Sequence, residues 1–164
     1  MFLFRKRKIY YKDDQITTSG LVFSPVTGKI VDIDENEETL NIKLKSFPWN
    51  EMGIHMPLTG EVKDVSREKG VVDLASNFPG RVAKVSLEGK EKDLIELSFG
   101  KSIFGGRPQL MVAPGDRGRR QVNIGFMPLG GTVELRLPKN CDLMVKVGDE
   151  LKAAESVVVG LKRK

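Results

Sequence analysis

The ten-residue stretch SPVTGKIVDI, residues 24–33, is nearly repeated as MPLTGEVKDV at residues 56–65. Each copy has a proline, a threonine two residues later and a glycine after that threonine, and each ends in an aspartate followed by an aliphatic residue. The proline fixes the backbone φ on the approach to a strand, and the glycine permits a positive φ. A generic hairpin does not require this combination twice. The repeat therefore predicts two related corners of one β structure.

The aliphatic residues after each glycine are spaced differently from those of a regular strand. Ile30 and Ile33 stand two and five residues after the glycine of the first copy. Val62 and Val65 stand at the same places in the second copy, and NFPGRVAKV, residues 77–85, is a partial third copy. Because side chains of a strand alternate with a period of two, a step of three predicts a bulge that bends each strand. Bent strands allow a small sheet to fold over itself as a barrel or sandwich.

Short apolar runs separated by turn residues fill most of the remaining sequence, with little helical periodicity. Residues 132–137 alternate most clearly, with Val, Leu and Leu on one face and Thr, Glu and Arg on the other. The acidic stretch DENEE, residues 34–38, is typical of a solvated hairpin loop. We therefore expect an all-β protein. The expected strands include residues 21–23, 39–44, 70–74, 94–99 and 132–137.

The size and composition favour one globular domain. The chain has a mass of 18.3 kDa, with 40% hydrophobic and 30% charged residues, as is typical of soluble proteins. We expect a single β domain at residues 20–161, between basic tails at residues 1–19 and 162–164. The sequence has no apolar run long enough to span a membrane. Its one cysteine, Cys141, and one histidine, His55, give no internal disulfide and no metal site. The absence of a secretory pattern favours the cytoplasm.

The net charge of +5 lies mainly on the two tails. A basic run near a membrane gains about 1 kcal/mol per residue from anionic lipid, so the first tail predicts peripheral contact with the inner face of the membrane. The alternative is a solvated tail that only aids solubility. Nucleic acid is not expected as a partner, because the body of the chain has no basic run with interleaved aromatic residues. The residues of this candidate membrane surface are Arg5, Lys6, Arg7 and Lys8.

The closing segment VKVGDELKAAESVVVGL, residues 145–161, is similar to the end of biotinyl- and lipoyl-type hybrid barrels. Together with the repeated Pro-x-Thr-Gly stretches, it resembles a duplicated barrel-sandwich hybrid. Carriers of this type display a lysine at a hairpin tip, within a Met-Lys-Met context. The nearest match in this chain, NEMGIHMP, has Gly53 where that lysine would stand. A swinging-arm carrier is therefore not expected.

Five segments come in the same order as characteristic segments of the phosphatidylserine decarboxylase family. They are FSPVTGKIVDI from residue 23, GIHMPLTGEV from residue 53, the arginine pair 119–120, LGGTVELRLP from residue 129 and LMVKVGDELKAAESVV from residue 143. The chain resembles this family over residues 21–160, which implies the same duplicated hybrid fold. Members of the family cleave their own backbone at a serine in a Leu-Gly-Ser motif. The new N-terminus becomes a pyruvoyl group that forms a Schiff base with the substrate amine.

The residues that match the family's site depart from its pattern. His55 matches the catalytic histidine, and Thr27 stands where the family has an aspartate that holds this histidine. Gly131 stands at the position of the self-cleaving serine, and glycine has no oxygen or sulfur nucleophile. The resemblance therefore implies neither a catalytic residue nor a pyruvoyl cofactor in this chain. The remnant pocket that it implies consists of Thr27, His55, Gly130, Gly131 and Thr132.

Three functional hypotheses follow. The favoured one is a non-catalytic relative of the family, kept as a binding or structural module in an assembly at a membrane surface. The second is an active phosphatidylserine decarboxylase-type lyase of phospholipid biosynthesis that uses Thr132, although a shift of one residue turns a side chain to the opposite face of a strand. The third is a phosphotransferase-type hybrid domain in which His55 carries phosphate. Such a site usually has a second histidine.

The segment APGDRGRRQ, residues 113–121, concentrates arginines in a loop with glycines. Guanidinium groups bind phosphate and carboxylate as a fork. The loop is therefore a candidate site for a phospholipid headgroup or an acidic partner, and a solvated loop is the alternative. A protein partner or a homo-oligomer through exposed strand edges is also expected. The candidate anion-binding residues are Arg117, Arg119 and Arg120.

Overall fold

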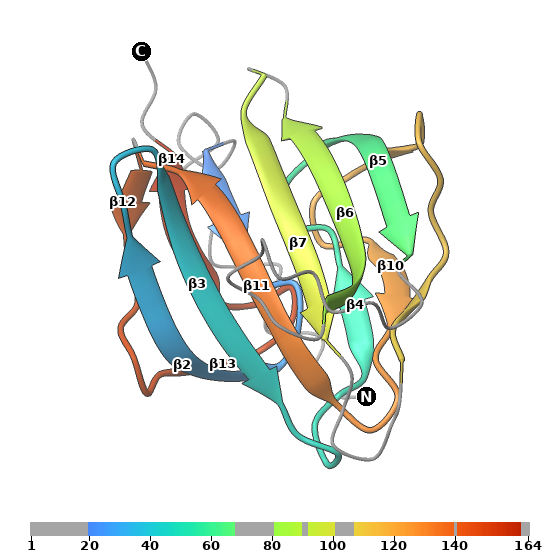
Figure 1. The fold of residues 1–164 in the computed structure, drawn as a ribbon, viewed down its shortest axis with the longest axis horizontal. Helices are drawn as coiled ribbons and strands as arrows, with labels where there is room; N and C mark the ends of the chain where they lie inside the picture. Colours follow the sequence, from blue (N-terminus) through green and yellow to red (C-terminus); the bar gives the residue numbers. More distant parts are fainter. Residues whose placement is uncertain (1–19, 68–80, 90–91, 101–106, 140, 162–164) are drawn as a thin grey trace.

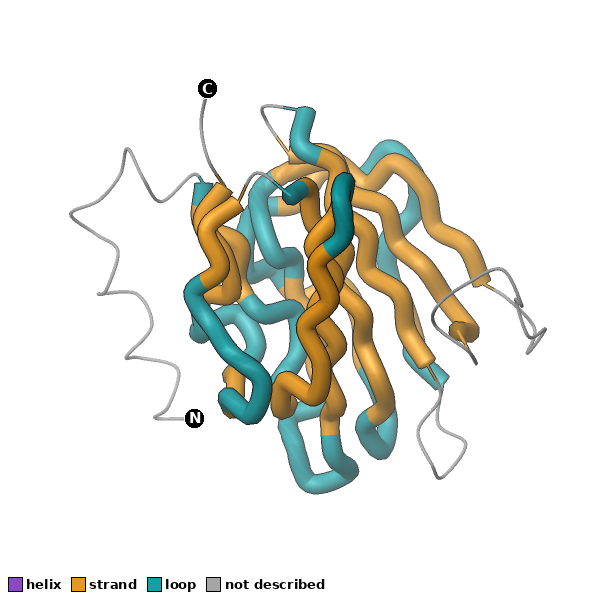
Figure 2. The backbone as a smooth tube through the Cα atoms, turned by 60° about the vertical axis from the view of Figure 1, so that its left-hand side comes forward, coloured by secondary structure: helices purple, strands orange, loops and turns teal. Residues whose placement is uncertain are grey.

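The structure is a computed structural model that describes five stretches of the chain: residues 20–67, 81–89, 92–100, 107–139 and 141–161. Within these stretches the chain forms fourteen β-strands and no helix, which confirms the all-β prediction (Figures 1 and 2). The strands are β1 (Leu21–Phe23), β2 (Gly28–Glu35), β3 (Thr39–Ser46), β4 (Gly53–His55), β5 (Gly60–Arg67), β6 (Arg81–Gly89), β7 (Leu94–Gly100), β8 (Gln109–Leu110), β9 (Arg117–Gly118), β10 (Asn123–Phe126), β11 (Gly131–Pro138), β12 (Cys141–Leu143), β13 (Glu150–Leu151) and β14 (Val157–Leu161).

The strands form one broad sheet and two small sheets. The broad sheet has eight strands in the order β13-β2-β3-β11-β7-β6-β5-β9. The small sheets have the orders β1-β14-β12 and β4-β10-β8. All strand pairs are antiparallel. Figure 1 looks onto the broad sheet, with the small sheets partly hidden behind it. The molecule is therefore built in layers of sheet, as a packed β domain requires.

Aliphatic side chains fill the space between the sheets. Leu135 of β11 and Ile42 of β3 are fully buried, as is Ile54 of the small sheet that contains β4. All three belong to one core cluster. The alternation predicted for residues 132–137 is confirmed, because the aliphatic residues of this run are buried whereas Arg136 is exposed. Each buried aliphatic side chain of this size contributes about 1.5–3 kcal/mol to folding.

The order of the strands reveals two equivalent halves. We define the first half as β1–β3 together with β11–β14, and the second half as β4–β10. The broad sheet consists of β13-β2-β3-β11 from the first half, followed by the equivalent strands in reverse, β7-β6-β5-β9. The small sheets β1-β14-β12 and β4-β10-β8 correspond in the same way. The second half is one continuous segment of chain between β3 and β11 of the first half.

The repeated stretches are the corners at which the two halves meet. The backbone N–H of Phe23 donates a hydrogen bond to the carbonyl oxygen of Pro57, at 2.8 Å. In the same way, the N–H of His55 donates to the carbonyl oxygen of Pro25, also at 2.8 Å. The carbonyl oxygen of each proline thus accepts the N–H of the residue two positions before the other proline. The two copies of the stretch are thus joined by a reciprocal pair of backbone hydrogen bonds.

Bulges occur where the aliphatic steps of three predicted them. The register of β2 against β3 shifts after Ile30, and the register of β5 against β6 shifts after Val62. A third shift follows Arg81 in β6, within the partial third copy. Each bulge turns the strand so that aliphatic residues on both sides of it can face the core.

Two Gly-Asp turns support the equivalent strands β13 and β9. One is VKVGD, residues 145–149, and the other is VAPGD, residues 112–116. Both turns have their glycine at positive φ, 97° for Gly148 and 95° for Gly115. In each turn the aspartate carboxylate accepts a hydrogen bond from the backbone N–H three residues earlier, at 3.0 Å in the first and 2.8 Å in the second. Of the two, only VKVGD lies in the closing segment that resembles the end of a hybrid barrel.

Some sequence predictions concern the ends and edges of these elements. The acidic residues 34–38 do lie at the β2–β3 hairpin, although β2 extends through Glu35 and only residues 36–38 form the connection. The predicted strand at residues 70–74 and the two basic tails lie outside the described residues. No described helix is long and apolar enough to cross a membrane.

Candidate functional site

His55 lies at the end of β4, an edge strand of a small sheet. It pairs with Asn123 of β10, where the register of the two strands shifts. The half-buried imidazole lies against Gly53, because a Cβ added at Gly53 would be 2.8 Å from the ring Cε1 atom. The same Cβ would be 3.0 Å from the side-chain nitrogen of Asn123. The absence of a side chain at position 53 therefore leaves the space that the ring occupies.

The hydroxyl of Thr27 is used by the fold. Its Oγ1 accepts a hydrogen bond from the backbone N–H of Ala153, at 3.0 Å. Thr59, the equivalent residue of the second half, accepts one from the N–H of Arg120, at 2.9 Å. Ala153 is fully buried, so its N–H needs an acceptor within the protein. The threonine of each repeated stretch thus holds in place a segment that is distant in sequence, at residue 153 in the first half and at residue 120 in the second.

Gly130 and Gly131 lie where the chain turns into β11. Their φ angles are 81° and 142°, in a region that favours glycine. A Cβ at Gly130 would overlap the carbonyl oxygen of Ser46, at the end of β3. Glycine is therefore required at position 130 by the close approach of another backbone segment.

Thr132 lies on the outer face of the broad sheet. Side chains of β11 alternate, and Val133 is fully buried in the core, so Thr132 shares the outer face with Glu134. Its neighbour across the strand pair is Lys45 of β3. His55 comes from a small sheet whose core residues pack on the inner face. The side chain of Thr132 is therefore directed away from the layer that contains His55.

The three candidate arginines do not lie at one site, although they are close in sequence. Arg117 belongs to β9 and pairs with Glu61 of β5, beside a groove of about 550 Å³. The exposed Arg119 also lines this groove. The guanidinium of Arg120 instead lies over the ring of Phe23, with its Cζ atom 4.8 Å from the ring centroid. The structure therefore brings two of the three arginines to one groove and turns the third toward an aromatic ring.

Acidic residues line the same groove. The ammonium of Lys63 lies 3.0 Å from Glu61 and 3.7 Å from Glu88, and both carboxylates belong to the lining. The hydrogen bond from Lys63 and its positive charge lower the pKa of Glu61, with a smaller contribution from Arg117. The hydrogen bond to Glu61 and its negative charge raise the pKa of Lys63. The groove therefore has mixed charge, which weakens its attraction for an external anion.

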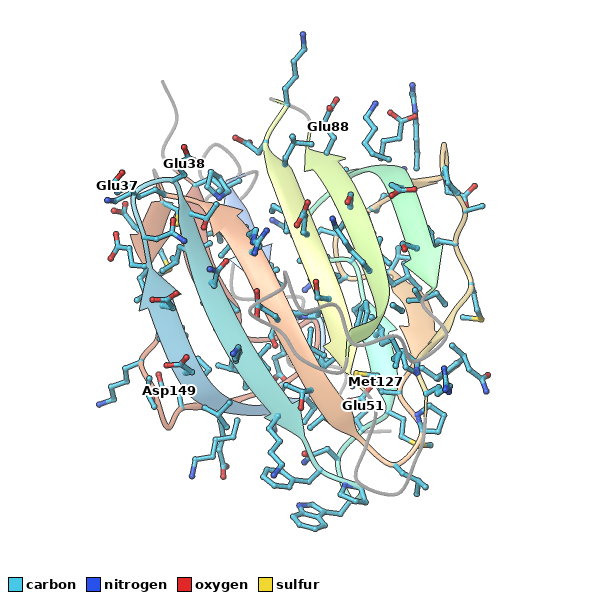
Figure 3. The ribbon with its side chains drawn as sticks, in the orientation of Figure 1. Glu37, Glu38, Glu51, Glu88, Met127 and Asp149 are labelled. Atoms are coloured by element: carbon cyan, nitrogen blue, oxygen red, sulfur yellow. The ribbon has the colours of Figure 1, made fainter. Side chains whose placement is uncertain are left out.

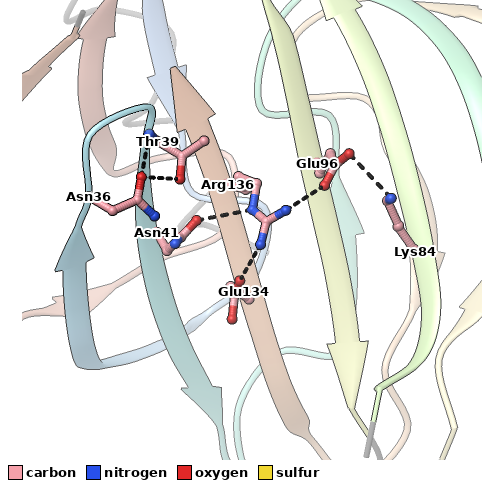
Figure 4. Close-up of polar contacts among 7 residues, drawn as sticks. All are labelled: Asn36, Thr39, Asn41, Lys84, Glu96, Glu134 and Arg136. Atoms are coloured by element: carbon pink, nitrogen blue, oxygen red, sulfur yellow. Dashed lines mark hydrogen bonds and ion pairs between the residues drawn. The ribbon is translucent and has the colours of Figure 1, made fainter. Parts of the chain in front are cut away.

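A second polar group, which the sequence analysis did not identify, crosses the outer face of the broad sheet (Figure 4). Arg136 of β11 lies 3.5 Å from Glu96 and 4.0 Å from Glu134, and its Nε donates to the side chain of Asn41 at 3.2 Å. Lys84 adds a 3.2 Å ion pair with Glu96. The alternation of residues 132–137 predicted the outward face only for Glu134 and Arg136. Their partners could not be predicted, because β3, β11 and the β6–β7 pair are distant from one another in sequence.

The structure also shows an exposed aromatic side chain for which the sequence analysis made no prediction. Trp49, in the connection between β3 and β4, is 78% exposed. Its ring stacks on that of Phe47, with centroids 5.0 Å apart. The signal in the sequence was the segment FPWN, in which two aromatic residues flank a proline between two strands.

Comparison with known proteins gives a consistent result. No family model matches the chain. Curated proteins named phosphatidylserine decarboxylase proenzyme do match it over most of its length. The protein from Nitrosomonas eutropha is 27% identical over 157 residues, which cover 87% of this chain and 70% of the relative. The protein from Syntrophus aciditrophicus is 28% identical over 150 residues, which cover 83% and 69%.

A third relative with the same name, from Desulfotalea psychrophila, is 24% identical over 173 residues, which cover 96% of this chain and 77% of the relative. The matches extend beyond the repeated corners, since they cover both halves of the fold. Their shared name agrees with the family that the sequence resembles. The chain is therefore a divergent relative of the phosphatidylserine decarboxylase proenzyme family.

Proposed function

We propose that this chain is a non-catalytic member of the family, a duplicated barrel-sandwich hybrid that acts as a binding or structural module in an assembly at a membrane surface. The observation that carries the proposal is Gly131, which stands at the start of β11 where the resemblance places the self-cleaving serine. Cleavage of the backbone at that position requires a side-chain nucleophile next to the peptide bond. Glycine has none, so no pyruvoyl group forms there.

The neighbouring hydroxyl is a poor substitute. Thr132 faces the outer side of the broad sheet, whereas His55 comes from the layer on the inner side. A general base must come within hydrogen-bond reach of the proton that it removes. Rotation about the bonds of one threonine does not carry its hydroxyl through a sheet. This arrangement supports the non-catalytic function.

The residue at the aspartate position also supports the proposal. Thr27 has no charge with which to hold a protonated imidazole, and its oxygen already accepts the N–H of Ala153. Thr59 makes the equivalent bond in the other half, where the resemblance places no catalytic residue. The threonine at position 27 is thus explained by the fold alone.

The experiment that tests the proposal is the intact mass of the purified protein. We expect one species of 18.3 kDa, because the chain does not cleave itself. Two fragments divided near residue 131, the second with a keto-acyl terminus, would contradict the proposal. Release of carbon dioxide from phosphatidylserine, measured on the same sample, should equal that of a blank.

Two variants make this test specific. Thr132→Ala should also be one intact species, with a mass that differs only by the substitution. If the unmodified protein were cleaved and Thr132→Ala were not, the cleavage would be assigned to Thr132. Gly131→Ser returns a hydroxyl to the position of the family's nucleophile. We expect this variant to stay intact as well, because Thr27 still offers no carboxylate to orient His55.

A further inference from the structure

Two neighbouring loops place apolar side chains in water at one end of the broad sheet. One loop connects β3 to β4 and the other connects β10 to β11. The exposed fraction is 78% for Trp49, 48% for Met52 and 45% for Leu129, and 42% for Phe126 at the end of β10. Single exposed apolar residues are common, but a group of them on adjacent loops indicates a contact surface. We call this surface the apolar tip. It consists of Phe47, Trp49, Met52, Phe126 and Leu129.

The loop that carries Trp49 is held in place by its own hydrogen bonds. The side-chain oxygen of Asn50 accepts the backbone N–H of Phe47 at 2.8 Å. The backbone N–H of Asn50 donates to the carbonyl oxygen of Phe47 at 2.9 Å. The rings of Phe47 and Trp49 are stacked, with an angle of 6° between their planes. The fold therefore presents the indole outward on a fixed support.

The second loop is joined to the first. The backbone N–H of Met127 donates to the carbonyl oxygen of Met52 at 2.7 Å. Gly130 lies so close to Ser46 that it has no room for a Cβ. Figure 3 labels Glu51 and Met127 near each other at the lower end of the molecule, where β3 ends and β11 begins. These contacts hold the two loops that carry the apolar tip side by side.

Two lysines lie directly behind the apolar tip, on the outer face of the broad sheet. Lys29 of β2 and Lys45 of β3 are exposed and stand opposite each other across the strand pair. The ammonium of Lys45 lies 5.6 Å from the ring centroid of Phe47. Glu150 of β13 is the neighbour of Lys29 on its other side, but within the described residues neither lysine takes part in an ion pair. Like charges directly opposite each other cost stability, so this pair is suited to an external anion.

The equivalent place in the second half has a different arrangement. Glu61 and Glu88 stand opposite each other there, and Lys63 bridges them. In the first half, Lys29 and Lys45 replace the two glutamates, and the position of the bridging lysine is a valine, Val31. Within the described residues, the half next to the apolar tip therefore has two facing lysines that no third side chain bridges, and Glu150 of β13 stands opposite Lys29 on its other side.

We propose that the apolar tip inserts into the interface of a lipid bilayer that contains anionic phospholipid, with Lys29 and Lys45 at the level of the headgroups. Tryptophan and phenylalanine partition into this region, and lysine stems extend to the anionic surface. A standard protein interface uses 20–30 residues on each side. A bilayer requires only a few apolar side chains on a protruding loop. The proposal deepens the membrane role in the proposed function, but it does not depend on whether the chain cleaves itself.

The test uses tryptophan fluorescence of the full chain. Trp49 is the one tryptophan in the sequence, so its emission reports on the apolar tip alone. Vesicles of phosphatidylcholine with phosphatidylglycerol should shift the emission to shorter wavelength, and phosphatidylcholine with brominated acyl chains, mixed into them, should quench it. Vesicles of phosphatidylcholine alone should give a weaker response, because they lack the anionic headgroup. Added salt should weaken the response to the anionic vesicles.

Flotation of variants with the same vesicles separates the apolar tip from the rest of the surface. Trp49→Ala should lower the partition constant about tenfold, as expected for loss of one buried aromatic side chain. The matched control is Leu94→Ala. Leu94 is 60% exposed at the far end of β7, and we expect no change in its partition. The double variant Lys29→Gln and Lys45→Gln should bind anionic vesicles more weakly, and its binding should depend less on salt.

Three results would overturn the proposal. The first is emission of Trp49 that is unchanged by anionic vesicles. The second is vesicle binding that Trp49→Ala leaves intact, which would assign the contact to another surface. The third is a blue shift that grows with protein concentration without vesicles, which would assign the apolar tip to a second copy of the chain. The intact mass tests the proposed function separately, since fragments would refute inactivity and leave the vesicle results standing.

Discussion

Phe23 and His55 stand at equivalent positions of the two halves, two residues before the repeated prolines, and their surroundings differ. Each donates its backbone N–H to the proline of the other half. The ring of Phe23 is 1% exposed and lies beneath Arg120, whereas His55 is half-buried beside Gly53. The backbone of the corner was therefore kept in both copies while the side chains on it changed. Function in such a fold is decided by a few positions on a shared framework.

The outer corners of the broad sheet differ in the same way. In the second half, Glu61 and Glu88 are joined by Lys63, which makes a self-neutralising surface. In the first half, Lys29 and Lys45 face each other beside the apolar tip, and Glu150 stands opposite Lys29 on its other side. The comparison shows that one β framework can carry either two glutamates bridged by a lysine or two facing lysines without such a bridge. The predictions below test how far the equivalence of the two halves extends.

The largest effect is expected from the glycines that begin the equivalent strands β2 and β5. A Cβ at Gly28 would overlap the carbonyl oxygen of Lys45, and a Cβ at Gly60 would overlap that of Glu88. Gly28→Ala and Gly60→Ala should each lower the free energy of unfolding by about 2–3 kcal/mol, because backbone must move in both cases. Urea unfolding followed by circular dichroism measures this change.

The control for these variants is Gly115→Ala. A Cβ at Gly115 meets no atom within 4 Å, and only the positive φ of 95° opposes the substitution. We expect a smaller loss, about 1–2 kcal/mol. A large loss for Gly60→Ala together with tolerance of Gly28→Ala would show that the halves are equivalent in topology but not in packing.

A smaller effect is expected at the threonines of the repeated stretches. Thr27→Val and Thr59→Val keep the shape of the side chain and remove the acceptor of a backbone N–H. The loss should be about 1–2 kcal/mol, and larger for Thr27 because its donor, Ala153, is fully buried. Thermal unfolding of both variants measures it. Thr27→Ser retains the hydroxyl and should recover most of the loss, whereas equal destabilisation by serine and valine would assign the effect to the lost methyl group.

The smallest effect concerns pH, and it should appear in the second half only. Because Lys63 lowers the pKa of Glu61, the contribution of this carboxylate is complete above the ordinary value of 4.5 and is lost as the pH falls through the folded-state pKa. The contribution of Lys63, whose pKa is raised, is complete below 10.5 and is lost as the pH rises through its folded-state value.

Nuclear magnetic resonance titration of the side-chain carboxyl of Glu61 measures the shift directly. Lys63→Met should return the pKa of Glu61 toward its ordinary value, with little change in stability, because Lys63 is exposed and Glu61 is partly exposed. Val31→Met, at the equivalent position of the first half, is the matched control and should leave this titration unchanged. An unshifted pKa of Glu61 in the unmodified protein would mean that the ion pair is not formed in solution.

Much of the scaffold could be predicted from the chain. The Pro-x-Thr-Gly repeat and the steps of three after it indicated two bent corners, and the bulges after Ile30 and Val62 confirm them. The second Gly-Asp turn was missed, because residues 112–116 precede a cluster of arginines that drew an interpretation as an anion-binding loop. The structure instead gives Asp116 and Gly115 the same role as their counterparts near the C-terminus.

The candidate site could be predicted less completely. The sequence identified which residue types stand at positions 27, 55 and 131, but not what they contact. It did not predict that Thr27 would hold a segment of chain 126 residues away, or that Arg120 would lie on an aromatic ring. It also gave no reason to expect that the loop containing Trp49 would face water rather than the core.

The sequence by itself determined the chemistry that each position can offer. Gly131 has no nucleophile in any fold. The repeated prolines restrict φ and the repeated glycines widen its range wherever they stand, because these are properties of single residues and their covalent neighbours. The tertiary structure alone decided which faces and neighbours those positions have. The hydroxyl of Thr132 is turned away from His55, and Lys29 stands opposite Lys45, because strand register fixes such relations between segments that are distant along the chain.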